Sequence, residues 1–194
     1  MPRTILWLTL GAFAVGTGTF SIAGLLPVIA ADLGVSVPAA GYLSMAFALA
    51  YAVASPVLAA ATASMERRRT LVLVMGAYAL ASAACAVVPG YAGLMGLRVL
   101  AALAAALFTP MAGACAVALV EPHHRGRAMA LVIGGMTLST VLGAPLGTLI
   151  GEYLGWRATF LVVAALGLVS ALGALAFLPR LPVAARPGSV RAWH

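Results

Sequence analysis

The chain has 194 residues, of which 64% are hydrophobic and only 8% are charged. A soluble domain carries about 25% charged residues, so this composition excludes an ordinary soluble protein and indicates a chain that lies in lipid. The net charge of +7 would favour a nucleic-acid partner in a soluble protein. Here the arginines gather beside the ends of apolar runs, and we expect no nucleic-acid partner.

Six apolar runs follow one another along the sequence, each long enough to cross a bilayer. Hydrocarbon offers no water to peptide groups, so such runs must be helices or barrel strands, and their length and near-continuous apolarity predict helices. We expect an all-α membrane protein with transmembrane helices at about 5–30, 41–63, 70–89, 92–120, 128–150 and 158–178. These make up one transmembrane domain over residues 1–180, followed by a cytoplasmic tail over 181–194.

The arginines predict the orientation of the chain. With the N-terminus inside, nine arginines fall in cytoplasmic segments and only Arg157 falls in an outer loop. Cytoplasmic loops carry an excess of basic residues in membrane proteins. We therefore expect a multi-pass protein of the cell membrane with both termini in the cytoplasm.

The first run contains residues that loosen a helix, namely Gly16, Gly18, Gly24 and Pro27. Flexible helices line substrate cavities in transporters, although close helix packing explains the glycines as well. On the first interpretation, the cavity-lining candidates are Thr19, Phe20, Ser21 and Gly24. Such an apolar surface with a few hydroxyl groups suits a small organic substrate better than an ion.

Two charged loops lie on the predicted cytoplasmic side. The first contains Glu66, Arg67, Arg68 and Arg69, and it is either a topology anchor or a gating loop. The second contains Glu121, His123, His124, Arg125 and Arg127 and has the character of a topology anchor. Two adjacent histidines without an acidic or cysteine cluster are a poor metal-ligand pattern, so we expect no metal and no cofactor.

Arg98 is the one charged residue well inside a predicted span. A charge at that depth costs at least about 2.5–3.5 kcal/mol on insertion scales. Snorkelling to the outer interface is one way to relieve this cost. The other interpretation is a functional arginine whose partners are carbonyls, hydroxyls, water, a substrate dipole or another chain, because the predicted spans contain no Asp or Glu.

Small residues recur at every fourth position of the fifth run, at Gly135, Ser139, Gly143, Gly147 and Gly151. This spacing predicts a stripe on which a neighbouring helix approaches closely. Pro145 lies within the stripe and should bend or loosen the helix. The stripe is either a packing surface only or a seam that controls which side of the membrane is open.

A shift of 89 residues superposes three pairs of identical residues on each other: Pro56 on Pro145, Arg68 on Arg157, and Thr70 on Thr159. Arg68 is predicted inside and Arg157 outside, as a repeat of three helices requires. We therefore expect a 3+3 inverted repeat, an arrangement that builds many transporters.

Several segments together resemble the N-terminal half of a major facilitator superfamily transporter, and more narrowly the drug:proton antiporters of the chloramphenicol-efflux and arabinose-export type. These segments are Gly24–Pro27, Ile29–Ser36, Glu66–Arg69, Arg98, Gly143–Gly147 and Gly155–Phe160. The resemblance covers residues 1–180 and implies a six-helix half bundle.

The resemblance also implies roles for particular residues. Arg98 matches an arginine implicated in proton coupling, and Gly143, Pro145 and Gly147 match the antiporter motif of the fifth helix. Arg67–Arg69 match the basic end of a loop motif whose glycine and aspartate are missing from residues 59–64. Thr19 stands where close relatives tend to have a glutamate, so this half lacks a membrane acid to carry a proton.

The leading functional prediction is efflux of a small hydrophobic, drug-like compound by alternating access with proton antiport. Such transporters have twelve helices, so we expect the chain to need a C-terminal six-helix half or a second chain, and not to transport alone. The alternative is a truncated six-helix membrane fragment or assembly partner. We do not expect an enzyme, because the histidines lie in a loop and in the tail rather than at membrane depth.

Overall fold

The computed structural model describes residues 4–62 and 65–179. Its long helices are α1 (Thr4–Leu33), α2 (Val37–Ala61), α3 (Arg67–Val87), α4 (Tyr91–Ala118) and α7 (Trp156–Phe177). A sixth continuous helical segment consists of α5 (Arg125–Leu138), η2 (Ser139–Gly143) and α6 (Ala144–Leu154), preceded by the short turn η1 (Pro122–His124). All six are long and apolar enough to cross a membrane, and the described residues contain no strand. The predicted fold class is confirmed.

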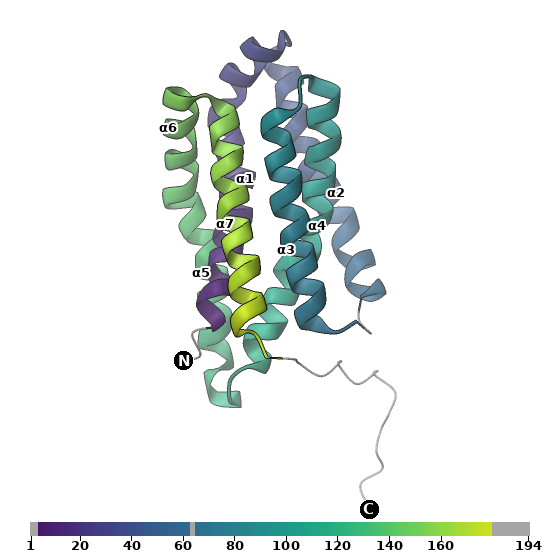
Figure 1. Ribbon diagram of the computed structural model, residues 1–194, viewed down its shortest axis with the longest axis vertical. Coiled ribbons are helices and arrows are strands. Elements are labelled where there is room, and N and C mark those ends of the chain that lie inside the picture. The colour runs from purple at the N-terminus through teal and green to yellow at the C-terminus, as the bar shows by residue number, and fades with distance from the viewer. Residues whose placement is uncertain (1–3, 63–64, 180–194) are drawn as a thin grey trace, which may run out of the picture.

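The helices run up and down in turn, so that sequence neighbours are antiparallel (Figure 1). Short connections with local capping groups make this possible. Ser36 caps α2 by accepting a hydrogen bond from the Ala39 N–H, and Glu66 caps α3 by accepting one from the Arg69 N–H at 3.2 Å. Such side chains satisfy amide groups that have no partner within the helix. Gly155 turns the chain between α6 and α7 at a φ of 84°, a conformation that favours glycine.

The helix ends differ from the predicted ones by a few residues. Two carboxylates that we predicted in the outer connections lie instead in the last turns of helices, Asp32 in α1 and Glu152 in α6. Both are exposed. The helices extend past the apolar runs because water at the membrane edge tolerates a charged last turn.

The fifth segment departs from the single regular helix that we predicted over 128–150. Ser139–Gly143 forms a π-helical turn, in which the Ala144 N–H donates to the Ser139 carbonyl. Pro145 follows directly, and proline lacks an N–H and crowds the carbonyl four residues before it, here that of Val141. The wide turn accommodates this crowding without interrupting the helix, which explains how Pro145 loosens the segment.

The start of α1 and the end of α7 lie at the same end of the bundle (Figure 1). The Thr4 hydroxyl at the start of α1 donates to the Phe177 carbonyl at the end of α7, at 3.1 Å. The predicted tail over 181–194 lies outside the described residues. α3 starts at this same end and α7 starts at the opposite one, so Arg68 and Arg157 lie at opposite ends, as the inverted repeat requires.

α1 is the central helix of the bundle, in contact with α2, α4, α5, η2, α6 and α7. Its side chains are correspondingly small where neighbours approach. A methyl group added at Gly11 would overlap the Phe108 ring of α4, and one at Gly18 would overlap the Tyr78 hydroxyl of α3. Glycine at these positions lets α3 and α4 approach the α1 backbone closely.

Candidate transport site

Arg98 lies deep in the bundle and points away from the nearer membrane surface. It is seven residues into α4, roughly 10 Å from the helix start at 1.5 Å per residue. Its side chain is only 2% exposed, and its Nη1 donates to the Gly18 carbonyl at 3.0 Å. Gly18 lies near the middle of α1. The guanidinium group therefore does not snorkel to the interface, and it reaches the middle of the membrane-spanning part instead.

Three helices besides α4 surround this guanidinium group. The ring of Phe47 in α2 lies 4.2 Å from the Arg98 Cζ, and Gly18 supplies the carbonyl from α1. Tyr78 of α3 is also fully buried, and its hydroxyl lies against the Gly18 Cα. Gly18 thus contacts two neighbouring side chains, because its missing side chain leaves room for Tyr78 and its carbonyl accepts a hydrogen bond from Arg98.

The partners of Arg98 stabilise the charge only in part. A desolvated cation–π contact contributes about 2 kcal/mol and a hydrogen bond from a charged group about 1.5–3 kcal/mol. Two donors, Nε and Nη2, have no hydrogen-bond partner among the described residues although they are buried. A buried donor without a partner carries the desolvation cost of that group. In this arrangement Nε and Nη2 are therefore buried donors of a charged group that the described residues leave unsatisfied.

The stripe in the fifth segment packs against α1. All five residues are buried: Gly135, Ser139, Gly143, Gly147 and Gly151. A methyl group at any of the four glycines would overlap an atom of α1, in sequence Thr9, Thr17, Ser21 and Leu25. The four pairs keep one constant separation along the chain, so two parallel helices pack in register over this whole length. Glycines that receive the side chains of a neighbouring helix let the two helices approach closely in lipid.

The packing is reciprocal, since α1 glycines also receive side chains from the fifth segment. Ser139 fits over Gly16, and Thr148 fits over Gly24. The Thr159 hydroxyl of α7 donates to the Gly147 carbonyl at 2.7 Å and joins a third helix to the seam. We call this α1–fifth-segment contact the seam. It brings the predicted stripe together with α1, a partner that the spacing of the stripe did not identify.

The four predicted cavity-lining residues are divided between two environments. Ser21 is buried beneath Gly147 and Gly24 contacts Thr148, so both belong to the seam. Phe20 is 39% exposed, and the Thr19 hydroxyl donates to the Val15 carbonyl of its own helix. No bound molecule tests their role, and cavity lining stays a prediction.

The predicted gating loop lies at the arginine-rich end of the bundle. Arg68 Nη2 donates to the Leu175 carbonyl at the end of α7, which attaches the loop to the last helix. Arg67 points elsewhere, into a cavity of about 250 Å³ between α2 and α4. Glu66 is engaged by the α3 backbone as described above. The described residues thus use these groups to fix helix ends, and a gating role stays a prediction.

The sequence of residues 8–192 matches the family model "Major Facilitator Superfamily". The chain belongs to this superfamily. It is 43% identical over 92% of its length to the "Chloramphenicol resistance protein" of Streptomyces lividans, and 37% identical over 94% of its length to the "Inner membrane transport protein YdhP" of Escherichia coli strain K12. It covers 46% and 47% of these relatives, so it spans about half the length of the curated relatives it matches.

Solved structures show the same superfamily fold. A bacterial homologue of the human lysosomal transporter Spinster, in an inward-facing and unoccupied conformation, superposes with a TM-score of 0.80 at 22% identity. That superposition covers 94% of this chain and 44% of the other. The predicted resemblance to an N-terminal half of a major facilitator superfamily transporter is confirmed.

Two segments that carry the superfamily resemblance meet at the end of the bundle opposite Arg68. Asp32 Oδ2 of the α1 end forms an ion pair with Arg157 and accepts from the Trp156 Nε1 at 3.1 Å. The Arg157 guanidinium lies 4.3 Å from the Trp156 ring centroid. Sequence reasoning noted both segments but missed this contact. The sequence signal for this contact was a single acidic residue at one outer helix end and a single arginine at another.

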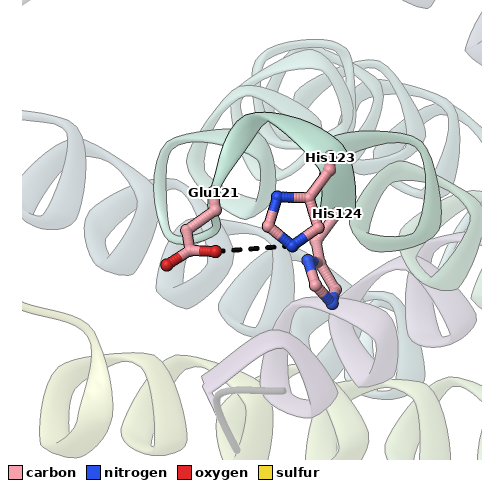
Figure 2. Close-up of side chains that lie close together, drawn as sticks. All are labelled: Glu121, His123 and His124. Atoms are coloured by element: carbon pink, nitrogen blue, oxygen red, sulfur yellow. Dashed lines mark ion pairs between the residues drawn. The ribbon is translucent and has the colours of Figure 1, made fainter.

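Figure 2 shows Glu121, His123 and His124 of the η1 turn with their side chains close together. Their ligand atoms lie within 4.8 Å of one another, and His123 Nε2 is 3.4 Å from Glu121 Oε2. The two side chains of that pair are 66% and 77% exposed. An exposed ion pair accounts for the contact when His123 is protonated. The residue pattern did not reveal that Glu121 approaches the histidines, and the absence of a metal stays a prediction.

Proposed function

We propose that the chain is the N-terminal half of an efflux transporter that exports a small hydrophobic, drug-like compound by alternating access with proton antiport. The observation that carries this proposal is Arg98, a fully buried cation with two unpartnered donors among the described residues. Such a group is expensive in a membrane, and intramembrane charges mark substrate and proton pathways. Similarity to a relative named for chloramphenicol resistance supports the drug class.

The role proposed for Arg98 is to bind a hydrogen-bond acceptor reversibly during the transport cycle. Asp32 and Glu152 are the acids within the described membrane helices, and both lie at helix ends. The acceptor is therefore a substrate dipole, water, or a carboxylate supplied by the second half. Proton release from such a carboxylate would alternate with substrate binding at the two vacant nitrogens.

The proposal also gives roles to the other candidate site residues, according to where they lie in the bundle. The seam, formed by the antiporter-motif residues Gly135, Ser139, Gly143, Pro145, Gly147 and Gly151, holds α1 and the fifth segment together and so controls which side of the membrane is open. The loop formed by Glu66, Arg67, Arg68 and Arg69 holds the arginine-rich end closed. Thr19, Phe20, Ser21 and Gly24 contribute to the substrate surface of α1.

We place the chain in the cell membrane with its arginine-rich end in the cytoplasm, following the charge asymmetry between the two ends. Cysteine variants at Gly34 and at Gly126 test this placement, because the two positions lie at opposite ends of the bundle. A membrane-impermeant maleimide added to intact cells should label the first variant and not the second. The reverse pattern would contradict the orientation.

Complementation tests the transport proposal. The chain is co-expressed in a drug-sensitive host with a C-terminal six-helix half, either its own downstream sequence or the matching half of the Streptomyces lividans relative. We expect chloramphenicol resistance that needs both halves. Arg98→Ala should abolish it and Arg98→Lys should restore little, because lysine lacks the two nitrogens that stay free. Arg127→Ala, an exposed arginine of α5, is the control and should retain resistance.

The second candidate is a six-helix assembly partner that does not transport. The observation that favours it is that the acids of the described membrane helices, Asp32 and Glu152, lie at helix ends rather than at membrane depth. In proteoliposomes containing the 194-residue chain alone, we expect no drug flux under either proposal. Resistance restored by the second half supports the transporter, whereas normal assembly of the two halves without resistance supports the partner role.

A further inference from the structure

An open groove of about 930 Å³ lies between the start of α3 and the end of α7, at the arginine-rich end of the bundle. Its lining combines charged residues at the helix ends with apolar residues along the helices. The lining includes Glu66, Arg68, Arg69, Leu73 and Leu175. This groove is separate from the Arg98 site, which lies deeper and between other helices.

The charged part of the groove is suited to an anion. Arg68 and Arg69 contribute two guanidinium groups, and Arg68 uses its Nη2 for the Leu175 carbonyl while retaining further N–H donors. The single carboxylate, Glu66, is engaged as the cap of α3 through its Oε2. The segment from 66 to 69 therefore keeps a net positive charge beside a helix N-terminus, which adds to the attraction for an anion.

The apolar part of the groove faces outward, where a membrane protein meets lipid chains. Leu73 is 65% exposed and Leu175 is 48% exposed, one on each wall. Both lie within one or two helical turns of the arginines, on the membrane side. A ligand that fits both parts has an anionic head group and a hydrocarbon chain.

We propose that this groove binds one anionic phospholipid, with its phosphate at Arg68 and Arg69 and an acyl chain along Leu73 and Leu175. Basic pockets between transmembrane helices suit anionic head groups. Charge argues against the chain's own C-terminal segment as the occupant, because residues 180–194 contain three arginines and no acidic residue. The proposal does not depend on the transport function.

Native mass spectrometry of the detergent-solubilised chain tests the proposal by counting retained lipid. The chain is titrated with palmitoyl-oleoyl phosphatidylglycerol or with the matching phosphatidylcholine. Each basic residue near an anionic lipid contributes about 1 kcal/mol, and a tenfold change in affinity corresponds to about 1.4 kcal/mol. With two arginines, we expect phosphatidylglycerol to bind roughly 10- to 30-fold more tightly than phosphatidylcholine. Equal retention of the two lipids would overturn the proposal.

Arg68→Ala/Arg69→Ala should reduce phosphatidylglycerol retention to the phosphatidylcholine level. Arg125→Ala/Arg127→Ala removes the same charge from the start of α5 at the same end of the bundle and should retain the preference. If both double variants lose the preference for phosphatidylglycerol equally, general surface charge explains the binding and the proposal fails. Leu73→Asn changes an exposed side chain with little risk to folding, and it should weaken retention of phosphatidylglycerol about threefold.

Soluble glycerophosphoglycerol distinguishes a lipid from a free phosphate compound. At millimolar concentration it should not displace phosphatidylglycerol, because it lacks the chains that contact Leu73 and Leu175. Full displacement by the soluble head group would show a phosphate site without a lipid component and would overturn the proposal.

Discussion

The two sides of α1 differ in how completely their contacts are made. Toward the fifth segment, the seam is filled, since each stripe glycine is in contact with an α1 atom and each hydroxyl lies over a glycine. Toward α4, the Gly18 carbonyl meets Arg98, whose Nε and Nη2 have no partner among the described residues. The seam is closely packed and leaves one buried hydroxyl, that of Thr17, without a partner among the described residues, whereas the Arg98 site leaves two donors of a charged group without one.

The difference teaches that close packing and an unsatisfied buried charge lie on different faces of one helix. Places where a sequence breaks a local rule of packing or polar satisfaction are where functional residues are expected. The seam holds α1 in a fixed register, and this fixed register presents Gly18 to Arg98. Variants on the two faces should therefore differ in kind, with large effects on stability at the seam and small ones at Arg98.

The largest effect is expected from Gly135→Ala at the seam. A methyl group there would meet the Thr9 carbonyl oxygen, a backbone atom that cannot turn away. Overpacking costs about 1–3 kcal/mol, and we expect a loss of stability at or above the upper end of this range. Thermal unfolding in detergent measures it. The matched control is Gly134→Ala, the adjacent residue with open space around it, and equal melting temperatures for both variants would refute the close contact.

Thr159→Val should have an intermediate effect. It keeps the shape of the side chain and removes the hydrogen bond to the Gly147 carbonyl, which is buried. Hydrogen bonds between membrane helices contribute about 0.6 kcal/mol on average and up to about 1.7 kcal/mol. The same change at Thr137, whose hydroxyl is exposed and bonded within its own helix, is the control. If Thr137→Val destabilises the chain as much, the inter-helix bond is not what stabilises the seam.

Asp32→Asn should have a smaller effect still. The Asp32 and Arg157 side chains are 45% and 39% exposed, so solvent and salt screen their attraction. We expect a loss of no more than about 1 kcal/mol, reduced further in high salt, because the amide oxygen of asparagine still accepts from Trp156. Unfolding at low and high salt measures this difference. An effect that does not change with salt would show that the contact is not electrostatic.

Arg98→Met should change stability least, although Arg98→Ala is expected to abolish transport. Replacing a buried ion by an apolar side chain of similar length is often neutral or stabilising, because the desolvation cost disappears. We expect a melting temperature equal to or above that of the unchanged chain. A marked fall would mean that Arg98 stabilises the bundle, and the comparison between the two faces of α1 would then be wrong.

The sequence predicted the helices well because lipid imposes a simple rule. A peptide group in hydrocarbon must be hydrogen-bonded within its segment, so a long apolar run is a helix whatever surrounds it. The stripe and the depth of Arg98 followed from spacing alone. The partner of the stripe did not, because spacing describes one helix and says nothing about which neighbour faces it.

Other features depend on tertiary contacts and could not be predicted from local pattern. Pro145 indicated a loosened helix, but it did not indicate that Ser139–Gly143 would take a π-helical form. The direction of the Arg98 side chain depends on the Gly18 carbonyl, more than 70 residues away in sequence. The contact of Asp32 with Arg157 joins two helix ends that only the assembled bundle brings together.

The hydrogen bond between the start of α1 and the end of α7 has a consequence for how such a bundle is combined with another. An even number of crossings returns the polypeptide to the face from which it set out. A second bundle of the same kind, fused in tandem or made from a separate gene, therefore inserts with the same polarity and needs no extra crossing to do so. Duplication of a six-helix unit is thus topologically neutral, in keeping with relatives about twice as long as this chain.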